Sequence, residues 1–225
     1  MRFSGGKGIT FKRMINRMPP HEVYIETHLG GGAVIRNKKS ARRNIGIEID
    51  PKVLARWNEE DKNGFEIIQG DGVQYLKEYP FIGNEMVYCD PPYLRETRRR
   101  KRKLYIYEYT YEQHVELLEA IKILPCMVMI SGYESDLYKE ILQDWHVEKF
   151  HSKTHAGVAV EWVWMNYSPP VQLHDYRYLG DNFRERESIK KKKEVWINKL
   201  KSLPILERQA LLSVIDSVRQ EMEFE

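Results

Sequence analysis

Short apolar runs alternate with longer amphipathic stretches along most of the chain. This alternation predicts an α/β fold in which a mostly parallel sheet carries helices on both faces. Two further apolar runs flank a glycine-containing turn near Gly157 and predict an antiparallel hairpin that closes the sheet. The runs that predict strands are Val23–Glu26, Asn44–Ile49, Phe65–Ile68, Glu85–Cys89, Met127–Ser131, Trp145–Ser152 and Val158–Tyr167.

Helical patterns lie between these runs. Asp50 is a favourable N-cap, and Pro51 suits the first turn of a helix. Three helices are expected in this part of the chain: one that begins at Ala33, one from Pro51 through Trp57, and one over Glu112–Ile123.

The composition changes after Pro169-Pro170. Residues 185–201 and 205–222 predict two helices separated at Pro204, and the second has an apolar face that needs a partner. We therefore expect an α/β domain over residues 1–180 and a basic helical extension over residues 181–225. Four roles are open for this extension: it packs on the sheet, it pairs with a second copy of the chain, it binds a partner protein, or it contacts phosphates through Lys190–Lys193.

Several classes of protein are disfavoured by the composition. No stretch approaches the roughly 18 apolar residues of a membrane span, and the N-terminus lacks the apolar core of a secretory signal. Cys89 and Cys126 both lie in apolar runs, which predicts buried free thiols and a cytoplasmic location. No Cys or His spacing is typical of a zinc site, so we expect no metal.

The positive charge is concentrated, although the formal net charge is only +3. Residues 95–103 read Arg-Glu-Thr-Arg-Arg-Arg-Lys-Arg-Lys. Localised positive charge of this kind favours a polyphosphate partner, and a solvated surface is the alternative.

Three carboxylates follow successive predicted strands, at the edge of the sheet where open α/β sheets bind ligands. They belong to Glu26, Glu48 and Asp71. Glu48 lies 18 residues after Gly30, a spacing at which nucleotide-binding folds place a carboxylate on ribose hydroxyls. The glycines at 30–32 allow the backbone to approach a ligand closely.

Asp90-Pro91-Pro92-Tyr93 follows a predicted strand directly and matches the signature of amino-group methyltransferases. An exocyclic amine conjugated to a purine is a poor nucleophile. Hydrogen bonds from its N–H groups to the Asp90 carboxylate and the Pro91 carbonyl would draw the nitrogen towards tetrahedral geometry, and Tyr93 offers a stacking face for a flipped base.

With the N-terminal Phe3-Ser4-Gly5-Gly6-Lys7 and the segment Glu161–Tyr167, these motifs resemble the D12 class of DNA adenine methylases, the Dam-like family, over roughly residues 1–170. The resemblance implies a Rossmann-like S-adenosylmethionine-dependent methyltransferase fold with a seven-stranded sheet. It also implies methyl transfer to the N6 amine of adenine in DNA, by base flipping and direct in-line transfer without a metal. The catalytic residues are then Asp90, Pro91, Pro92 and Tyr93. The cofactor-binding residues are Phe3, Lys7, Glu26, Gly30, Gly32, Glu48 (ribose) and Asp71 (adenine end).

The chain departs from the family pattern at three places. Thr27 and His28 stand where Pro-Phe is usual, and Gly72 stands where an aromatic residue often follows the aspartate. Only 18 residues, 72–89, separate Asp71 from Asp90, which leaves no room for the usual inserted target-recognition domain. A short or relaxed target sequence is therefore expected.

Contact with nucleic acid is consequently expected from the basic stretch after Tyr93, which has aromatic neighbours in Tyr105, Tyr107 and Tyr109. The residues expected to make it are Arg98, Arg99, Arg100, Lys101, Arg102 and Lys103.

Two alternatives stay open. The same chemistry serves RNA adenine-N6 methyltransferases, and a catalytically silent relative would only bind nucleic acid. The sequence leaves open the target site, the strand state, the oligomeric state and the biological role, whether restriction-modification, phage-encoded modification or regulation.

Overall fold

The computed structural model describes residues 7–8, 10–59, 64–98, 106–154 and 157–222. The chain divides into two compact units, Met1–Tyr176 and Arg177–Glu225.

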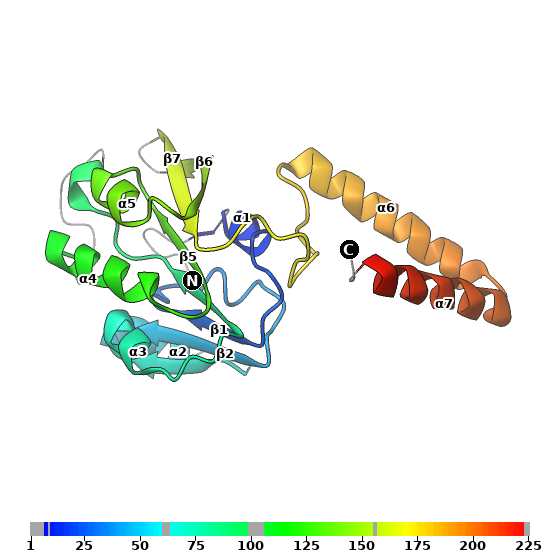
Figure 1. The fold of residues 1–225 in the computed structure, drawn as a ribbon, viewed down its shortest axis with the longest axis horizontal. Coiled ribbons are helices and arrows are strands. Elements are labelled where there is room, and N and C mark those ends of the chain that lie inside the picture. Colours follow the sequence, from blue (N-terminus) through cyan, green and yellow to red (C-terminus); the bar gives the residue numbers. More distant parts are fainter. Residues whose placement is uncertain (1–6, 9, 60–63, 99–105, 155–156, 223–225) are drawn as a thin grey trace. The chain divides into compact units, whose positions relative to one another are not determined.

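The first unit is built on a seven-stranded sheet with the order β3-β2-β1-β4-β5-β7-β6 (Figure 1). Strands β1 to β5 run parallel, whereas β7 is antiparallel to both β5 and β6. The strands are β1 (Val23–Glu26), β2 (Arg43–Glu48), β3 (Glu66–Gln69), β4 (Glu85–Cys89), β5 (Met127–Gly132), β6 (His146–Thr154) and β7 (Gly157–Met165). The predicted fold class is confirmed.

Helices cover both faces of the sheet. One face packs against α3, α4 and α5 in a cluster that includes Ile25, Val87 and Ile130 from the strands. Residues that alternate with these along the central strands, such as Tyr24 and Met86, are also fully buried, so the centre of the sheet is covered on both faces. The helices of this unit are α1 (Phe11–Ile15), α2 (Pro51–Glu59), α3 (Gly72–Glu78), α4 (Tyr111–Lys122) and α5 (Asp136–Ile141), with a 3-10 turn, η1, at Arg95–Thr97.

The chain order places a switch point between β1 and β4. The connections from β1 lead through β2 to β3 on one side, and those from β4 lead to β5 on the other. Open α/β sheets bind ligands outside the carboxyl ends of the strands at such a point. The segments that leave β1 at Thr27 and β4 at Asp90 therefore flank the expected site.

The helix predicted from Ala33 is wrong. Residues 29–38 form consecutive turns, and Gly30 and Gly32 have φ angles of 49° and 60°. The Ile35 amide donates to the Glu26 carboxylate at 3.0 Å. The Lys39 amide donates to the Asp175 carboxylate at 2.8 Å, so the backbone bonds of these turns do not continue into a regular helix.

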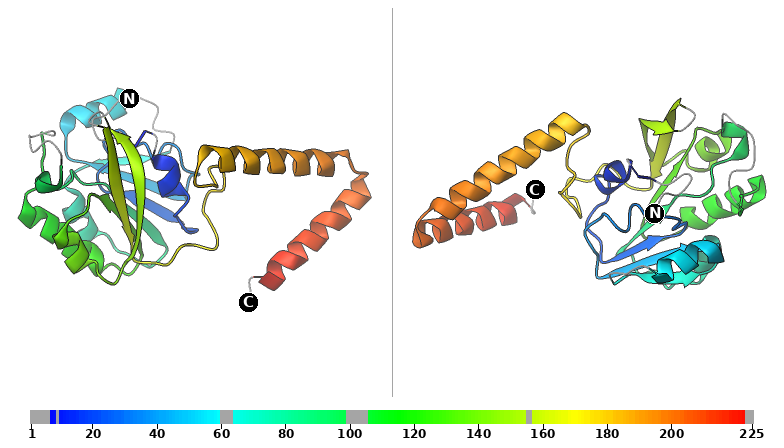
Figure 2. Two further views of the ribbon diagram at one scale, coloured as in Figure 1. Left: turned by 90° about the horizontal axis from the view of Figure 1, so that it is seen from above. Right: turned by 180° about the vertical axis from the view of Figure 1, so that it is seen from behind.

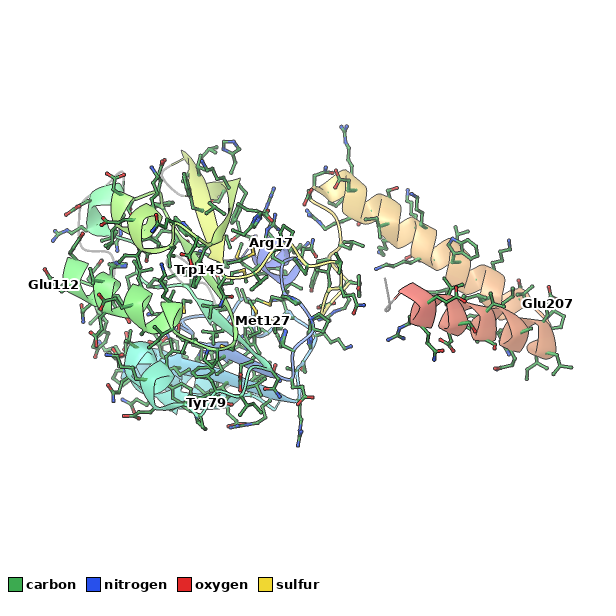
Figure 3. The ribbon with its side chains drawn as sticks, viewed as in Figure 1. Arg17, Tyr79, Glu112, Met127, Trp145 and Glu207 are labelled. Carbon is green, nitrogen blue, oxygen red and sulfur yellow. The ribbon has the colours of Figure 1, made fainter. Side chains whose placement is uncertain are left out.

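The β6–β7 hairpin extends the sheet at one edge (Figure 2). Arg17, just after α1, donates from Nε to the Glu148 carboxylate of β6 at 2.8 Å and ties the N-terminal segment to this hairpin (Figure 3).

The second unit contains the two predicted C-terminal helices, α6 (Phe183–Ser202) and α7 (Ile205–Met222). Asn182 caps α6 by accepting the Glu185 amide, and the break between the helices falls at Leu203-Pro204. Large apolar side chains are exposed on both helices, among them Trp196 at 62%. Among the described residues, no helix has the length and apolar character needed to cross a membrane.

Candidate active site

Parallel strands bring the sequence-predicted carboxylates to one edge of the sheet. Glu26 ends β1 and Glu48 ends β2, and Asp90 follows the last residue of β4. Glu26 pairs in register with Gly46 of β2 and Tyr88 of β4, so the three strands end at similar heights.

The carboxylate of Asp90 is held from one side. Lys7 Nζ lies 2.8 Å from Oδ1, and Ser131 Oγ donates to the same oxygen at 2.8 Å. A carboxylate accepts at both of its oxygens. These two donors occupy Oδ1, and Oδ2 is the atom that we assign to a substrate amine below.

Lys7 lies at the centre of a buried charge cluster. Its side chain is 5% exposed, and its ammonium contacts Asp90, the Tyr93 hydroxyl and Glu161 of β7, the last at 3.3 Å. Burial alone would lower the pKa of Lys7, but the charges of the nearby Asp90 and Glu161 outweigh it and raise that pKa well above its usual value. The Lys7 ammonium therefore forms ion pairs with both the Asp90 and the Glu161 carboxylates.

The sequence did not single out Glu161 or Ser131 as site residues. Glu161 is only 10% exposed in its side chain, and the Tyr93 hydroxyl donates to it at 3.4 Å. Both residues lie in segments matched to later strands of the family. Only the order of the strands, with β7 beside β5 and β5 beside β4, brings them to Asp90.

Tyr93 is anchored at its hydroxyl, and Lys7 Nζ also lies over its ring, 4.8 Å from the ring centroid. The ring meets Tyr133 edge to face, with centroids 4.7 Å apart. Pro91 and Pro92 link this ring rigidly to Asp90, because proline fixes φ. The predicted turn of Asp90-Pro91-Pro92-Tyr93 therefore presents a carboxylate, a carbonyl and an aromatic ring together.

The Glu48 carboxylate binds two backbone amides, one in the turns at 29–38 and one just before α2. Its Oε2 accepts the Gly30 amide at 2.8 Å, and its Oε1 accepts the Asp50 amide at 2.8 Å. A Cβ on Gly32 would lie 2.4 Å from the Trp57 ring, whose Nε1 donates to the Gly30 carbonyl at 2.8 Å. The backbone at Gly30 and Gly32 therefore packs closely against Trp57. The Glu48 carboxylate can still accept hydrogen bonds from further donors such as sugar hydroxyls.

Glu26 is more deeply buried than the other strand-end carboxylates. Its Oε2 accepts from the Tyr24 hydroxyl at 2.9 Å and from the Ile35 amide at 3.0 Å. Burial raises the pKa of Glu26 to about 8 despite these bonds. Glu26 therefore shapes the turns that follow β1, and its predicted contact with a cofactor stays a prediction.

Asp71 caps α3 through Oδ1, which accepts the Val73 amide at 2.8 Å and the Gln74 amide at 3.0 Å. The next residue must be small, because a Cβ on Gly72 would lie 2.4 Å from the Thr27 carbonyl oxygen. The two departures from the family pattern, at Thr27 and Gly72, are therefore in direct contact.

His28 is half-buried and forms hydrogen bonds at both ring nitrogens. Nδ1 lies 2.8 Å from Thr27 Oγ1, and Nε2 lies 2.8 Å from the Tyr109 hydroxyl. Burial lowers the pKa of His28 to about 4, so the ring is neutral. Tyr109, one of the aromatic neighbours of the basic stretch, meets His28 edge to face, with centroids 5.2 Å apart.

Arg98 differs from the exposed phosphate contact that the sequence suggested. It is 7% exposed, and its guanidinium pairs with both oxygens of Glu108, at 2.9 and 2.7 Å. It also donates to the Tyr93 carbonyl. Arg98 thus supports the turn behind Asp90. The other predicted nucleic-acid contacts, Arg99, Arg100, Lys101, Arg102 and Lys103, lie outside the described residues, as does Phe3.

Within the described part of the chain, no group of three or more His, Cys, Asp or Glu side chains is arranged to hold a metal ion. Cys89 and Cys126 are buried free thiols, as predicted.

A family model matches a little under half of this chain. Residues 47–156 match the D12 class of N6 adenine-specific DNA methyltransferases. The matched segment contains Glu48, Asp71, Asp90 and Ser131, whereas Lys7 and Glu161 lie outside it. The resemblance to the D12 class is confirmed, and no curated protein matches the chain.

Solved structures of similar fold are distant in sequence. Precorrin-6y C5,15-methyltransferase of Geobacter metallireducens is 13% identical with a TM-score of 0.45, over 72% of this chain and 93% of that one. Magnesium protoporphyrin IX methyltransferase of Synechocystis, with bound SAM, is 11% identical with a TM-score of 0.46, over 70% and 76%. A dimethyladenosine transferase of Plasmodium falciparum is 12% identical with a TM-score of 0.44, over 73% and 62%.

Proposed function

We propose that this protein transfers a methyl group from S-adenosylmethionine to the N6 amine of adenine in DNA. The observation that carries the proposal is the Asp90 carboxylate, which is held at Oδ1 by Lys7 and Ser131 directly after β4. The D12 family match, which includes this residue, supports the same reaction class.

The residues of the turn have distinct parts in the reaction. One N–H of the adenine amine donates to Asp90 Oδ2 and the other to the Pro91 carbonyl, which frees the nitrogen lone pair from conjugation with the ring. S-adenosylmethionine supplies an electrophilic methyl group on a sulfonium. In a direct transfer the new N–C bond would form as the C–S bond breaks, leaving S-adenosylhomocysteine, and the proton that the amine gives up would pass to the Asp90 carboxylate that accepts its N–H and on to solvent.

The cofactor fits the edge formed by Gly30, Gly32 and Glu48. The close packing of Gly32 on Trp57 draws this loop onto the core, and the Glu48 oxygens keep acceptor capacity for ribose hydroxyls. Asp71 and the His28–Tyr109 pair lie on the side of the site that the family pattern assigns to the adenine end of the cofactor. Phe3, Lys7 and Glu26 remain predicted cofactor contacts.

Recognition of DNA is assigned to the basic residues 99–103. Arg98, which precedes them, pairs with Glu108 and donates to the Tyr93 carbonyl. A flipped base is expected to stack on the Tyr93 ring, which follows Asp90 in the same turn. A cytoplasmic location is consistent with the two free thiols.

The test is a methylation assay with double-stranded DNA, single-stranded DNA and RNA, each digested to nucleosides and analysed by mass spectrometry. N6-methyladenine in DNA is expected, and Asp90→Ala should abolish it while retaining S-adenosylmethionine binding in calorimetry. N6-methyladenine only in RNA would overturn the DNA assignment. Cofactor binding without any product, or no cofactor binding at all, would contradict the enzymatic reading.

A further inference from the structure

Two buried hydroxyls lie directly behind Asp90. Ser131 of β5 and Tyr88 of β4 are both 0% exposed. Cys89 and Ile130 are partners in the parallel register, so the residues that follow them, Asp90 and Ser131, lie side by side. Ser131 Oγ is 2.8 Å from Asp90 Oδ1 and 3.0 Å from the Tyr88 hydroxyl.

The direction of these bonds follows from counting protons. Each hydroxyl has a single proton to donate, and a carboxylate can only accept. Burial, together with the charge of Asp90, raises the pKa of Tyr88 well above its usual value, so its hydroxyl keeps the proton. Ser131 donates to Asp90 at 2.8 Å in preference to the Cys89 carbonyl at 3.4 Å, and its own oxygen accepts from Tyr88.

We propose that Ser131 and Tyr88 are positioning residues that fix the Asp90 carboxylate so that Oδ2 faces the target amine. This inference rests on the proposed adenine methylation. Ser131 and Lys7 reach Oδ1 from different elements, and two bonds to one oxygen stop the carboxylate from turning about its terminal torsion. Tyr88 acts only through Ser131, because it orients the serine proton and does not touch Asp90 in a hydrogen bond.

The test compares Ser131→Ala, Tyr88→Phe and the double variant in single-turnover methylation of DNA, with S-adenosylmethionine binding measured by calorimetry. A hydrogen bond to a charged group contributes about 1.5–3 kcal/mol, so Ser131→Ala should slow methyl transfer roughly tenfold to hundredfold. The cofactor Kd should stay within about twofold, because the change acts on the target amine. Tyr88→Phe should slow the reaction less. The double variant should match Ser131→Ala, since a residue that acts through another adds nothing once that one is gone.

Two further variants separate positioning from loss of folding. Tyr167→Phe removes a tyrosine hydroxyl that donates to the Arg17 carbonyl at 3.0 Å, and it should keep the wild-type rate. Ser131→Cys preserves side-chain size with a weaker donor, so its rate should fall between those of wild type and Ser131→Ala.

A wild-type rate in Ser131→Ala, or losses that multiply in the double variant, would overturn the positioning role while leaving the proposed function intact. A wild-type protein that methylates no nucleic acid would refute both.

Discussion

Lys7 is expected to stabilise the active site far more than either carboxylate it contacts. It lies 2.8 Å from Asp90 and 3.3 Å from Glu161, and the three side chains are only 5%, 16% and 10% exposed. Lys7→Met would leave two neighbouring carboxylates without their cation. Breaking a buried ion pair in this way costs about 3–5 kcal/mol.

Glu161→Gln should be much milder, because it leaves one cation facing one carboxylate and an amide oxygen that still accepts from Tyr93. We expect a loss of about 1 kcal/mol or less from it, in the range of a single net hydrogen bond. The double variant should be more stable than Lys7→Met alone, since only one carboxylate is then unpaired.

Urea unfolding followed by circular dichroism at neutral pH measures these differences. The pKa of Lys7 is raised, so its charge persists through the neutral range and the comparison does not depend on small pH errors. Equal destabilisation by the two single changes, or strict additivity in the double variant, would show that Lys7 is not the shared cation of both carboxylates.

Two other predictions concern stability. Burial lowers the pKa values of His21 and His114 to about 3 and about 4, so the folded protein keeps both neutral while the unfolded chain takes up protons below about pH 6.5. The free energy of unfolding should therefore fall by roughly 2 kcal/mol per histidine between pH 7 and pH 5, and His114→Gln should flatten this dependence in urea titrations; an unchanged slope would contradict it. Gly32→Ala should lower the free energy of unfolding by more than about 2 kcal/mol, because the φ of Gly32 is +60° and the new Cβ would meet Trp57. Gly64 has a φ of +79° and nothing within 4 Å of a new Cβ, so Gly64→Ala should show only the backbone strain of about 1 kcal/mol in the same assay.

The sheet could be predicted because its strands carry their own signals. Glu85–Cys89 is an apolar run ended by two prolines, and the structure gives β4 the same bounds. The turns at 29–38 could not be predicted to stop where they do, since the Lys39 amide that follows them bonds to Asp175, 136 residues further along the chain.

The candidate site also contains residues that the sequence could reveal and residues that it could not. The motif Asp90-Pro91-Pro92-Tyr93 is contiguous, so its residue types and spacing alone indicated the chemistry. Ser131 lies 41 residues from Asp90 and reaches it only through strand register. Arg98 looked like part of an exposed basic run, and only its pairing with Glu108 reveals its internal place.

The ion pair between Arg98 and Glu108 fixes both ends of segment 99–107 at one point behind Tyr93. The entropic cost of closing a loop rises by only about 0.6 kcal/mol for each doubling of its length. Insertions between Arg98 and Glu108 should therefore cost little folding free energy as long as the ion pair itself is kept. Under the proposed function, exchanging this short segment would change the contact with DNA without altering Asp90-Pro91-Pro92-Tyr93.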